Sequence, residues 1–233
     1  MLHLALNKRN KMTFKDLFYE TMINVYAFRV QLSKALLFPF ILSVLLDIIS
    51  VSMSNIYISV IYSILSLMIK TIFAVTTHRM ILLGPDSVPE WGTAKWSSRE
   101  TAFILYLLAL AFMIFIISII IQVPVFGVLI FFVLIFLYLV LLIPRLSLVF
   151  PAIAVGDSCS FKTSWAVTRN YQKEMIFATI LIPLTASIPI IILLYLPYTF
   201  LLVSVLKNVT TVIGVAALSL SYKYILDEVL KGS

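Results

Sequence analysis

The sequence predicts an all-α polytopic membrane protein with six transmembrane helices, arranged as three hairpins, and amphipathic interfacial helices on the cytoplasmic side. Three observations support this fold class. The chain of 233 residues is 62% hydrophobic and only 12% charged, which is more apolar surface than a soluble domain of that length covers. The apolar residues form long runs, and the basic residues alternate between successive connections.

Each apolar run has about 20 residues, the length that one crossing of a bilayer requires. The predicted spans are residues 35–53, 56–76, 101–121, 125–143, 175–195 and a last span that begins at 200 or 208 and ends at 222. We expect residues 1–12 to form a flexible cytoplasmic tail and residues 13–233 to form a single integral membrane domain.

The charges of the connections predict the orientation of the chain. The connections 52–55, 122–124 and 196–199 contain no Lys or Arg, whereas the other connections and both termini contain every basic residue except Lys70 and Lys207. Cytoplasmic loops of membrane proteins carry the excess of Lys and Arg. We therefore expect both termini to lie in the cytoplasm.

The segment 13–33, before the first span, has the pattern of an amphipathic helix. Its apolar residues recur every three or four positions, and they are Phe14, Leu17, Phe18, Met22, Val25, Phe28 and Leu32. Thr13 and Asp16 have the spacing of a capping box, which predicts a helix start. The helix either lies along the inner face of the membrane with its apolar side in the acyl boundary, which we favour, or packs on the protein's own loops.

The two long basic loops repeat one arrangement, in which an Arg leaves a span and a Trp and a second Arg follow. These residues are Arg79, Trp96 and Arg99 in the first loop and Arg145, Trp165 and Arg169 in the second. Anionic headgroups are the nearest partners of basic residues beside a membrane. The arrangement predicts contact with lipids of the cytoplasmic leaflet, with a membrane-protein partner or with a second copy of the chain. No basic block is long enough to follow a phosphate backbone, which argues against nucleic acid.

Several motifs in and around these loops resemble a known family. They are RLSLVFPAIAVG at 145–156, Ser160-Phe161, Trp165, Thr168-Arg169-Asn170, HRMILLG at 78–84 and LSLSYK at 218–223. They resemble the YciC-like group of uncharacterised bacterial inner-membrane proteins, which is similar to the membrane domain of some glycerophosphodiester phosphodiesterases. The resemblance is strongest over 75–175 and implies a multi-span inner-membrane protein with cytoplasmic loops. It does not carry the phosphodiesterase activity over, because these 233 residues contain no soluble phosphodiesterase domain.

Two ionisable residues lie inside predicted spans, Asp47 in the first and Lys70 in the second. Charges at such depth cost on the order of 3 kcal/mol, which makes them functional candidates. Their depths differ by roughly 12 Å at a rise of about 1.5 Å per residue, so we do not expect a direct ion pair. Lys70 either extends to the inner headgroups or faces a polar cavity. Asp47 is protonated, reaches the outer interface, or has a functional role.

Hydroxyl-bearing residues extend each of these positions into a polar stripe along one helix face. The stripes are Ser43, Asp47 and Ser50 in the first span and Ser59, Ser63, Ser66 and Lys70 in the second. Two such stripes on adjoining helices either line a hydrated groove that admits a polar headgroup or a small solute, or allow the helices to pack closely.

Small residues, prolines and one lysine characterise the later spans. The last span carries the small side chains of a close helix contact, which are Thr210, Gly214, Ala217 and Ser221. Pro183 and Pro189 predict kinks in the fifth span. Lys207 is either buried in a last span that begins at 200, or wetted on an outer-surface segment 197–207, which we favour. The third and fourth spans are almost free of polar residues and are expected to face lipid.

Catalytic chemistry is not predicted. The two histidines, His3 and His78, do not supply a metal triad or a Ser-His relay, and Asp47 is the only carboxylate inside a predicted span. We expect no enzyme activity, cofactor or metal. The favoured function is that of a non-enzymatic, envelope- or lipid-associated plasma-membrane protein that contacts anionic lipid or a partner. The alternative is a transporter or lipid-moving protein that uses the polar stripes.

Overall fold

The protein is all-α over the residues that its computed structural model describes, which are 12–50, 55–92, 96–122 and 127–232. Within these residues, six stretches are long and apolar enough to cross a membrane. Four of them are single helices: α2 (Arg29–Ser50), α3 (Ile56–Leu83), α4 (Ser98–Ile119) and α12 (Phe200–Gly232). The fourth span is built from α5 (Gly127–Leu137), η3 (Tyr138–Leu142), α6 (Ile143–Leu146) and α7 (Val149–Val155). The fifth span is built from α9 (Gln172–Ile176), η4 (Phe177–Leu181), α10 (Ile182–Ala186) and α11 (Ile188–Leu193). The predicted six-span helical membrane fold is confirmed.

Shorter elements complete the described chain, namely α1 (Phe14–Ala27), η1 (Pro85–Ser87), η2 (Ile120–Gln122) and α8 (Phe161–Thr168). The predicted tail lies outside the described residues except for Met12, as do residues 51–53 and 125–126 at the ends of two predicted spans.

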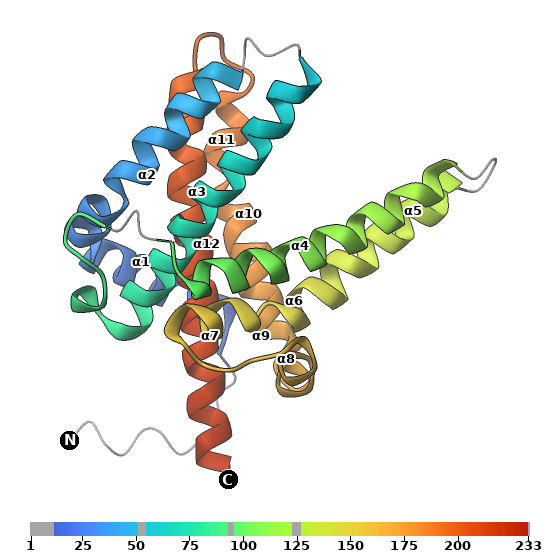
Figure 1. Ribbon diagram of the computed structural model, residues 1–233. Coiled ribbons are helices and arrows are strands. Elements are labelled where there is room, and N and C mark those ends of the chain that lie inside the picture. The colour runs from blue at the N-terminus through green and yellow to red at the C-terminus, as the bar shows by residue number, and fades with distance from the viewer. Residues whose placement is uncertain (1–11, 51–54, 93–95, 123–126, 233) are drawn as a thin grey trace.

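The two longest helices, α3 and α12, lie side by side through the centre of the molecule (Figure 1). Both begin at the end of the bundle where α2 finishes, which we call the hairpin end, and α12 finishes at the opposite, terminal end. Ala216 and Ser219 of α12 have no exposed surface. His78 Nδ1 lies 2.8 Å from Ser219 Oγ, and this hydrogen bond joins α3 to α12 inside the bundle.

The small-residue face of α12 packs against α10, as its sequence predicts. A Cβ atom at Gly214 would lie 3.2 Å from Pro183 Cγ. Thr210 Oγ1 donates to the carbonyl of Ala186 at 3.2 Å, and Ala217 is fully buried. A larger side chain at Gly214 would push the two helices apart, so the absence of a side chain is what allows the contact.

The fifth span is interrupted beside both of its prolines, which confirms the predicted kinks. The π-helical turn η4 ends just before Pro183, and Ser187 separates α10 from α11 just ahead of Pro189. Proline has no N–H for the helical ladder and its ring crowds the preceding turn, and each of these two prolines is the second residue of a new α-helical segment.

We expected segment 13–33 to form one helix, but in the structure it is divided between α1 and the start of α2. The capping box at Thr13 is present, since Thr13 Oγ1 accepts from the Asp16 N–H at 3.2 Å and Thr13 N donates to the Asp16 carboxylate at 3.2 Å. The Thr13 hydroxyl also donates to the Asp16 carboxylate at 2.6 Å, and this bond, together with that from the Thr13 N–H, holds the pKa of Asp16 below its ordinary value. However, α1 ends at Ala27 and α2 begins at Arg29.

The apolar stripe of α1 is covered by the protein rather than by lipid. Leu17 and Thr21 have no exposed surface, and Leu17 packs in one cluster with Ala216 of α12 and Ile182 of α10. This packing favours the alternative, in which the helix packs on the protein, but its partners are the spans that contain α10 and α12 and not loops.

The α4–α5 hairpin leans away from the rest of the bundle (Figure 1). The main contacts of α4 outside the hairpin are with α3 and α7, and Tyr138 OH donates to the carbonyl of Leu110 at 2.9 Å, which ties the two arms together. Large apolar side chains such as Phe112 and Phe132 are exposed along it. This exposure agrees with the expectation that these two spans face lipid.

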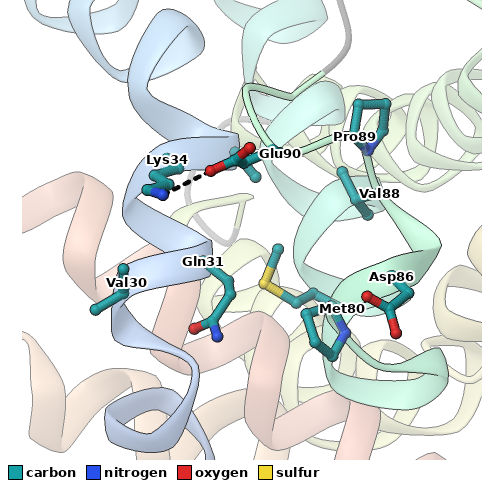
Figure 2. Close-up of a pocket in the computed structure, with 10 residues that line it drawn as sticks. Val30, Gln31, Lys34, Met80, Asp86, Val88, Pro89 and Glu90 are labelled. Atoms are coloured by element: carbon teal, nitrogen blue, oxygen red, sulfur yellow. Dashed lines mark hydrogen bonds and ion pairs between the residues drawn. The ribbon is translucent and has the colours of Figure 1, made fainter.

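The connection that follows α3 folds back onto α2 as a strap, residues 84–92 (Figure 2). Gly84 ends α3 with φ +88, a backbone conformation that glycine adopts without strain. Lys34 Nζ of α2 and Glu90 Oε1 of the strap form an ion pair at 2.6 Å. The strap therefore reaches the neighbouring helix before the chain enters α4.

Candidate functional site

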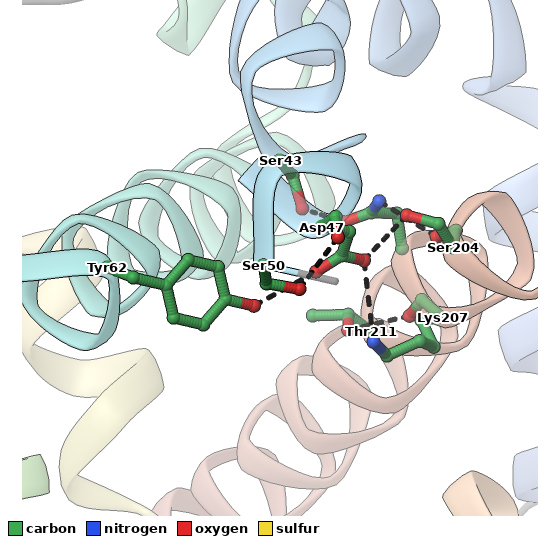
Figure 3. Close-up of polar contacts among 8 residues, drawn as sticks. Ser43, Asp47, Ser50, Tyr62, Ser204, Lys207 and Thr211 are labelled. Atoms are coloured by element: carbon green, nitrogen blue, oxygen red, sulfur yellow. Dashed lines mark hydrogen bonds and ion pairs between the residues drawn. The ribbon is translucent and has the colours of Figure 1, made fainter. Parts of the chain in front are cut away.

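The polar stripe of α2 faces α12, and Asp47 lies at the centre of the contact (Figure 3). Its Oδ2 accepts from Ser204 Oγ at 2.6 Å and lies 3.4 Å from Lys207 Nζ. Its Oδ1 accepts from Tyr62 OH of α3 at 3.1 Å. The side chain of Asp47 is 13% exposed and that of Lys207 is 55% exposed. A carboxylate enclosed in a membrane span thus receives two hydroxyl donors and one cation.

A second layer of hydrogen bonds surrounds this carboxylate. Ser43 Oγ donates to Asn208 Oδ1 at 3.2 Å, and Asn208 Nδ2 donates to the Ser204 carbonyl at 3.0 Å. Ser50 Oγ donates to the Asp47 carbonyl at 2.7 Å. Together Ser43, Asp47, Tyr62, Ser204, Lys207 and Asn208 form what we call the Asp47 cluster. Because buried polar groups are costly unless they are paired, the cluster joins three spans at specific positions.

The serine stripe of α3 does not take part in this cluster, which corrects the predicted groove between the first two spans. Ser59 and Ser63 donate to carbonyls four residues back on their own helix. Ser66 is half-buried and Lys70 is exposed, and within the described part of the chain neither side chain forms a hydrogen bond with Asp47. A serine in a helix satisfies its hydroxyl locally, so its position in a stripe does not require a partner helix.

The hydrogen-bonding partners in the Asp47 cluster are instead residues that the sequence analysis did not identify as candidates. Tyr62 lies on α3, one residue before Ser63, and Ser204 and Asn208 lie four residues apart on α12. The helical spacing of Ser204, Lys207 and Asn208 is a polar stripe in its own right, and this was the signal available in the sequence.

Residues 200–207 belong to the same helix as the last span and do not form a separate segment; whether Lys207 lies at the outer surface, the favoured interpretation, stays a prediction. Helix α12 runs without a break from Phe200 to Gly232, so Lys207 lies two turns inside the helix. Its ion pair with Asp47 explains how a lysine is accommodated there.

Some of the predicted lipid-contact residues of the first loop form hydrogen bonds within the protein instead. Arg79 Nη1 donates to the Ala154 carbonyl at 3.2 Å, and Arg79 Nε and Nη2 donate to the Ser87 carbonyl at 3.3 and 2.9 Å. Arg79 therefore joins α3, the strap and α7. Arg99 is half-buried at the start of α4, and Trp96 Nε1 donates to Thr101 Oγ1 at 2.9 Å.

In the second loop, too, one arginine forms contacts within the protein and the other is exposed. Arg145 Nε and Nη2 donate to Gln172 Oε1 at 3.1 and 2.7 Å, and its guanidinium lies 4.5 Å from the centre of the Trp165 ring. The Arg145 carbonyl accepts from Ser164 Oγ at 2.6 Å. Arg145 thus holds α8 in place, whereas Arg169 is exposed.

An apolar groove of about 320 Å³ runs along the face of α2 that borders the Asp47 cluster, and we call it the α2–α12 groove. Its lining comes from α1, α2, α3 and α12 and comprises Val25, Arg29, Leu32, Ser33, Leu36, Leu37, Phe40, Phe73, Asn208, Val209 and Val212. Arg29 lies at its terminal end, and Asn208 joins it to the cluster. Of these residues, the sequence analysis singled out only Val25 and Leu32, as members of the apolar stripe of 13–33.

The guanidinium of Arg29 retains hydrogen-bonding capacity. Its Nη1 donates to the Tyr26 carbonyl at 2.9 Å, and the group lies 4.1 Å from the centre of the Tyr26 ring. A guanidinium has five N–H donors, and Arg29 is exposed. The terminal end of the groove therefore offers a positioned cation beside an apolar wall.

Comparison with protein-family models, with characterised proteins and with solved structures finds no match to this chain. The resemblance of residues 75–175 to the YciC-like group stays a prediction.

Proposed function

We propose that this chain is a non-enzymatic multi-pass protein of the bacterial inner membrane, with both termini in the cytoplasm, that binds an anionic phospholipid in the α2–α12 groove. The observation that carries the proposal is the combination, in one groove, of an apolar wall and an exposed arginine at the terminal end. The distribution of Lys and Arg supports a cytoplasmic position for that end.

The dimensions and openness of the groove suit an acyl chain. From Arg29 to Phe40, α2 advances about 16 Å at a rise of about 1.5 Å per residue, which is roughly half of a hydrocarbon core of about 30 Å. Leu37 and Val209 on its rim are 44% and 45% exposed, so the groove opens sideways to the bilayer. A lipid of one leaflet would enter there without leaving the membrane.

The headgroup would lie at Arg29. A guanidinium binds phosphate through two parallel N–H bonds, and a basic residue beside an anionic leaflet contributes about 1 kcal/mol to membrane binding. Arg79 and Arg145 are less suited, because their donors already bind carbonyls and Gln172. Arg99 and Arg169, with Trp96 and Trp165, remain candidates for weaker contacts with anionic headgroups or with a protein partner.

Native mass spectrometry of the detergent-purified protein tests this proposal. Arg29→Gln should reduce retention of phosphatidylglycerol by about fivefold, the equivalent of about 1 kcal/mol, and Val209→Trp should reduce it by filling the groove from its exposed rim. Lys162→Gln removes the same charge from an exposed position of α8 and should leave retention unchanged. Equal retention by wild type, Arg29→Gln and Val209→Trp would disprove the lipid site.

The ion pair within the Asp47 cluster favours a second candidate function, movement of phospholipid between leaflets. Charged groups inside spans often mark substrate pathways, and Lys207 is exposed enough to meet a headgroup. The test is the flip rate of fluorescent phospholipid in proteoliposomes. Wild type should accelerate flipping and the double variant Asp47→Asn with Lys207→Gln should not; a flip rate for wild type equal to that of empty liposomes removes this candidate.

A further inference from the structure

A second cavity, of about 520 Å³, lies on the other side of α2, beneath the strap (Figure 2). We call it the strap pocket. Its lining is Val30, Gln31, Lys34 and Ala35 of α2, Met80 of α3, and Pro85, Asp86, Val88, Pro89 and Glu90 of the strap. On α2, these positions alternate with those of the α2–α12 groove, so the two cavities use opposite faces of one helix.

The strap is held at both ends, so the pocket is preformed. At one end, the Arg79 guanidinium donates to the Ser87 carbonyl, and Ser87 Oγ lies 3.1 Å from the Arg79 carbonyl and 2.6 Å from the Gly84 carbonyl. At the other end, a Cβ atom at Gly92 would lie 2.1 Å from the Ala35 carbonyl oxygen. Strap and helix backbones are thus in direct contact, and a ligand would not have to order this loop in order to bind.

The walls of the strap pocket combine an apolar floor with an excess of negative charge. Met80 and Val88 are buried, and Pro85 and Pro89 also line the cavity. Figure 2 shows Lys34 and Glu90 meeting on one side of the cavity and Asp86 on the other.

The ion pair between Lys34 and Glu90 balances the positive charge of the lysine with the negative charge of the glutamate. Asp86 has no ion-pair partner among the described residues. One cation and two carboxylates leave a net charge of −1 on the lining.

We propose that the strap pocket binds a small organic cation, an ammonium group attached to an apolar body. The ammonium would lie at the Asp86 carboxylate, and the apolar body would cover Met80, Val88 and the two prolines. An anion of the same size would meet the excess negative charge and be rejected. This inference does not depend on the proposed lipid site, because it uses the opposite face of α2.

Isothermal titration of the detergent-purified protein with benzyltrimethylammonium tests the inference, with phenylacetate as the anionic probe of similar size. Wild type should bind the cation and not the anion. Asp86→Asn should weaken binding by about fivefold, the upper range of an exposed charge pair, and Val30→Trp should abolish it by filling the cavity from an exposed position. Asp227→Asn removes an exposed carboxylate from α12 and should have no effect.

The outcomes separate the two proposals. Absence of cation binding by wild type, equal binding of phenylacetate, or equal weakening by Asp86→Asn and Asp227→Asn would each overturn the strap-pocket inference. Arg29→Gln should bind the cation like wild type while losing lipid.

Discussion

Asp47 of α2 and Lys207 of α12 form an ion pair at 3.4 Å across 160 positions of the chain. The two partners differ in their surroundings, because Asp47 is 13% exposed and Lys207 is 55% exposed. The carboxylate therefore depends on its partners, whereas the lysine can extend its charge away from the apolar region. This asymmetry makes the pair testable.

Lys207→Gln should lower the free energy of unfolding by about 1 to 2 kcal/mol, and Asp47→Asn should lower it less. The first change leaves an enclosed carboxylate without its cation, and breaking such a pair is costly; the second leaves a lysine that reaches the surface. Thermal unfolding in detergent measures both. Lys70→Gln, at an exposed position of α3, should have no effect, and a larger loss for Asp47→Asn than for Lys207→Gln would contradict the proposed asymmetry.

The two glycines of the strap should respond differently to alanine. Both have positive φ, +88 at Gly84 and +73 at Gly92, but a Cβ at Gly84 meets nothing within 4 Å, whereas at Gly92 it would lie 2.1 Å from the Ala35 carbonyl. Gly84→Ala should cost about 1 kcal/mol through backbone strain alone. Gly92→Ala should cost more and also open the strap. Unfolding temperatures and proteolysis of the strap measure this, and equal costs would refute the close contact with α2.

Arg145→Lys should loosen α8. Lysine does not reproduce two bonds from one planar group to Gln172 together with stacking on Trp165, and the cation–π contact alone is worth about 0.5 to 1 kcal/mol. Trypsin should cleave after exposed Lys162 about fivefold faster than in wild type, because local opening of α8 becomes more frequent. Arg169→Lys keeps an exposed trypsin site on the same segment and should not change the rate; the same acceleration in both variants would show that Arg145 does not anchor α8.

Cys159 reports the orientation of the chain. Burial, with a smaller effect of Asp157, raises the pKa of its thiol above the ordinary value. The thiolate is the reactive form, so maleimide labelling of the folded protein should be slow at neutral pH and accelerate by about tenfold per pH unit while the thiol remains protonated. Labelling of inverted vesicles but not of intact spheroplasts is expected. Labelling of spheroplasts by an impermeant reagent would reverse the proposed orientation.

The elements of the fold that could be predicted are those that depend on the local sequence. The spans followed from apolar length, the start of α1 from Thr13 and Asp16, the interruption of the fifth span from its prolines, and the close contact of α12 from Gly214. In the first three cases neighbouring residues decide the outcome, through burial in lipid, hydrogen bonding of a helix end, or the missing N–H of proline. Gly214 indicates that another helix can approach closely, but the tertiary structure decides that this helix is α10.

The candidate sites required knowledge of which helices are neighbours. Asp47 was identified as a candidate, but the sequence left open whether its stripe lines a groove with that of the second span or allows close packing, and it did not identify Tyr62, Ser204 or Lys207 as partners. Lipid tails are as apolar as the leucine side chains that pack between helices, so hydrophobic periodicity alone does not reveal the order of helices around the bundle.

The sequence by itself therefore determined that this is a helical membrane protein with six spans, because the bilayer selects for apolar length regardless of tertiary contacts. Only the tertiary structure decided that Asp47 meets α12, that Arg79 and Arg145 are committed to internal contacts, and that α2 has a groove on one face and a pocket on the other. These features depend on atoms brought within hydrogen-bonding or van der Waals distance from distant parts of the chain, and the arrangement of the helices fixes those distances.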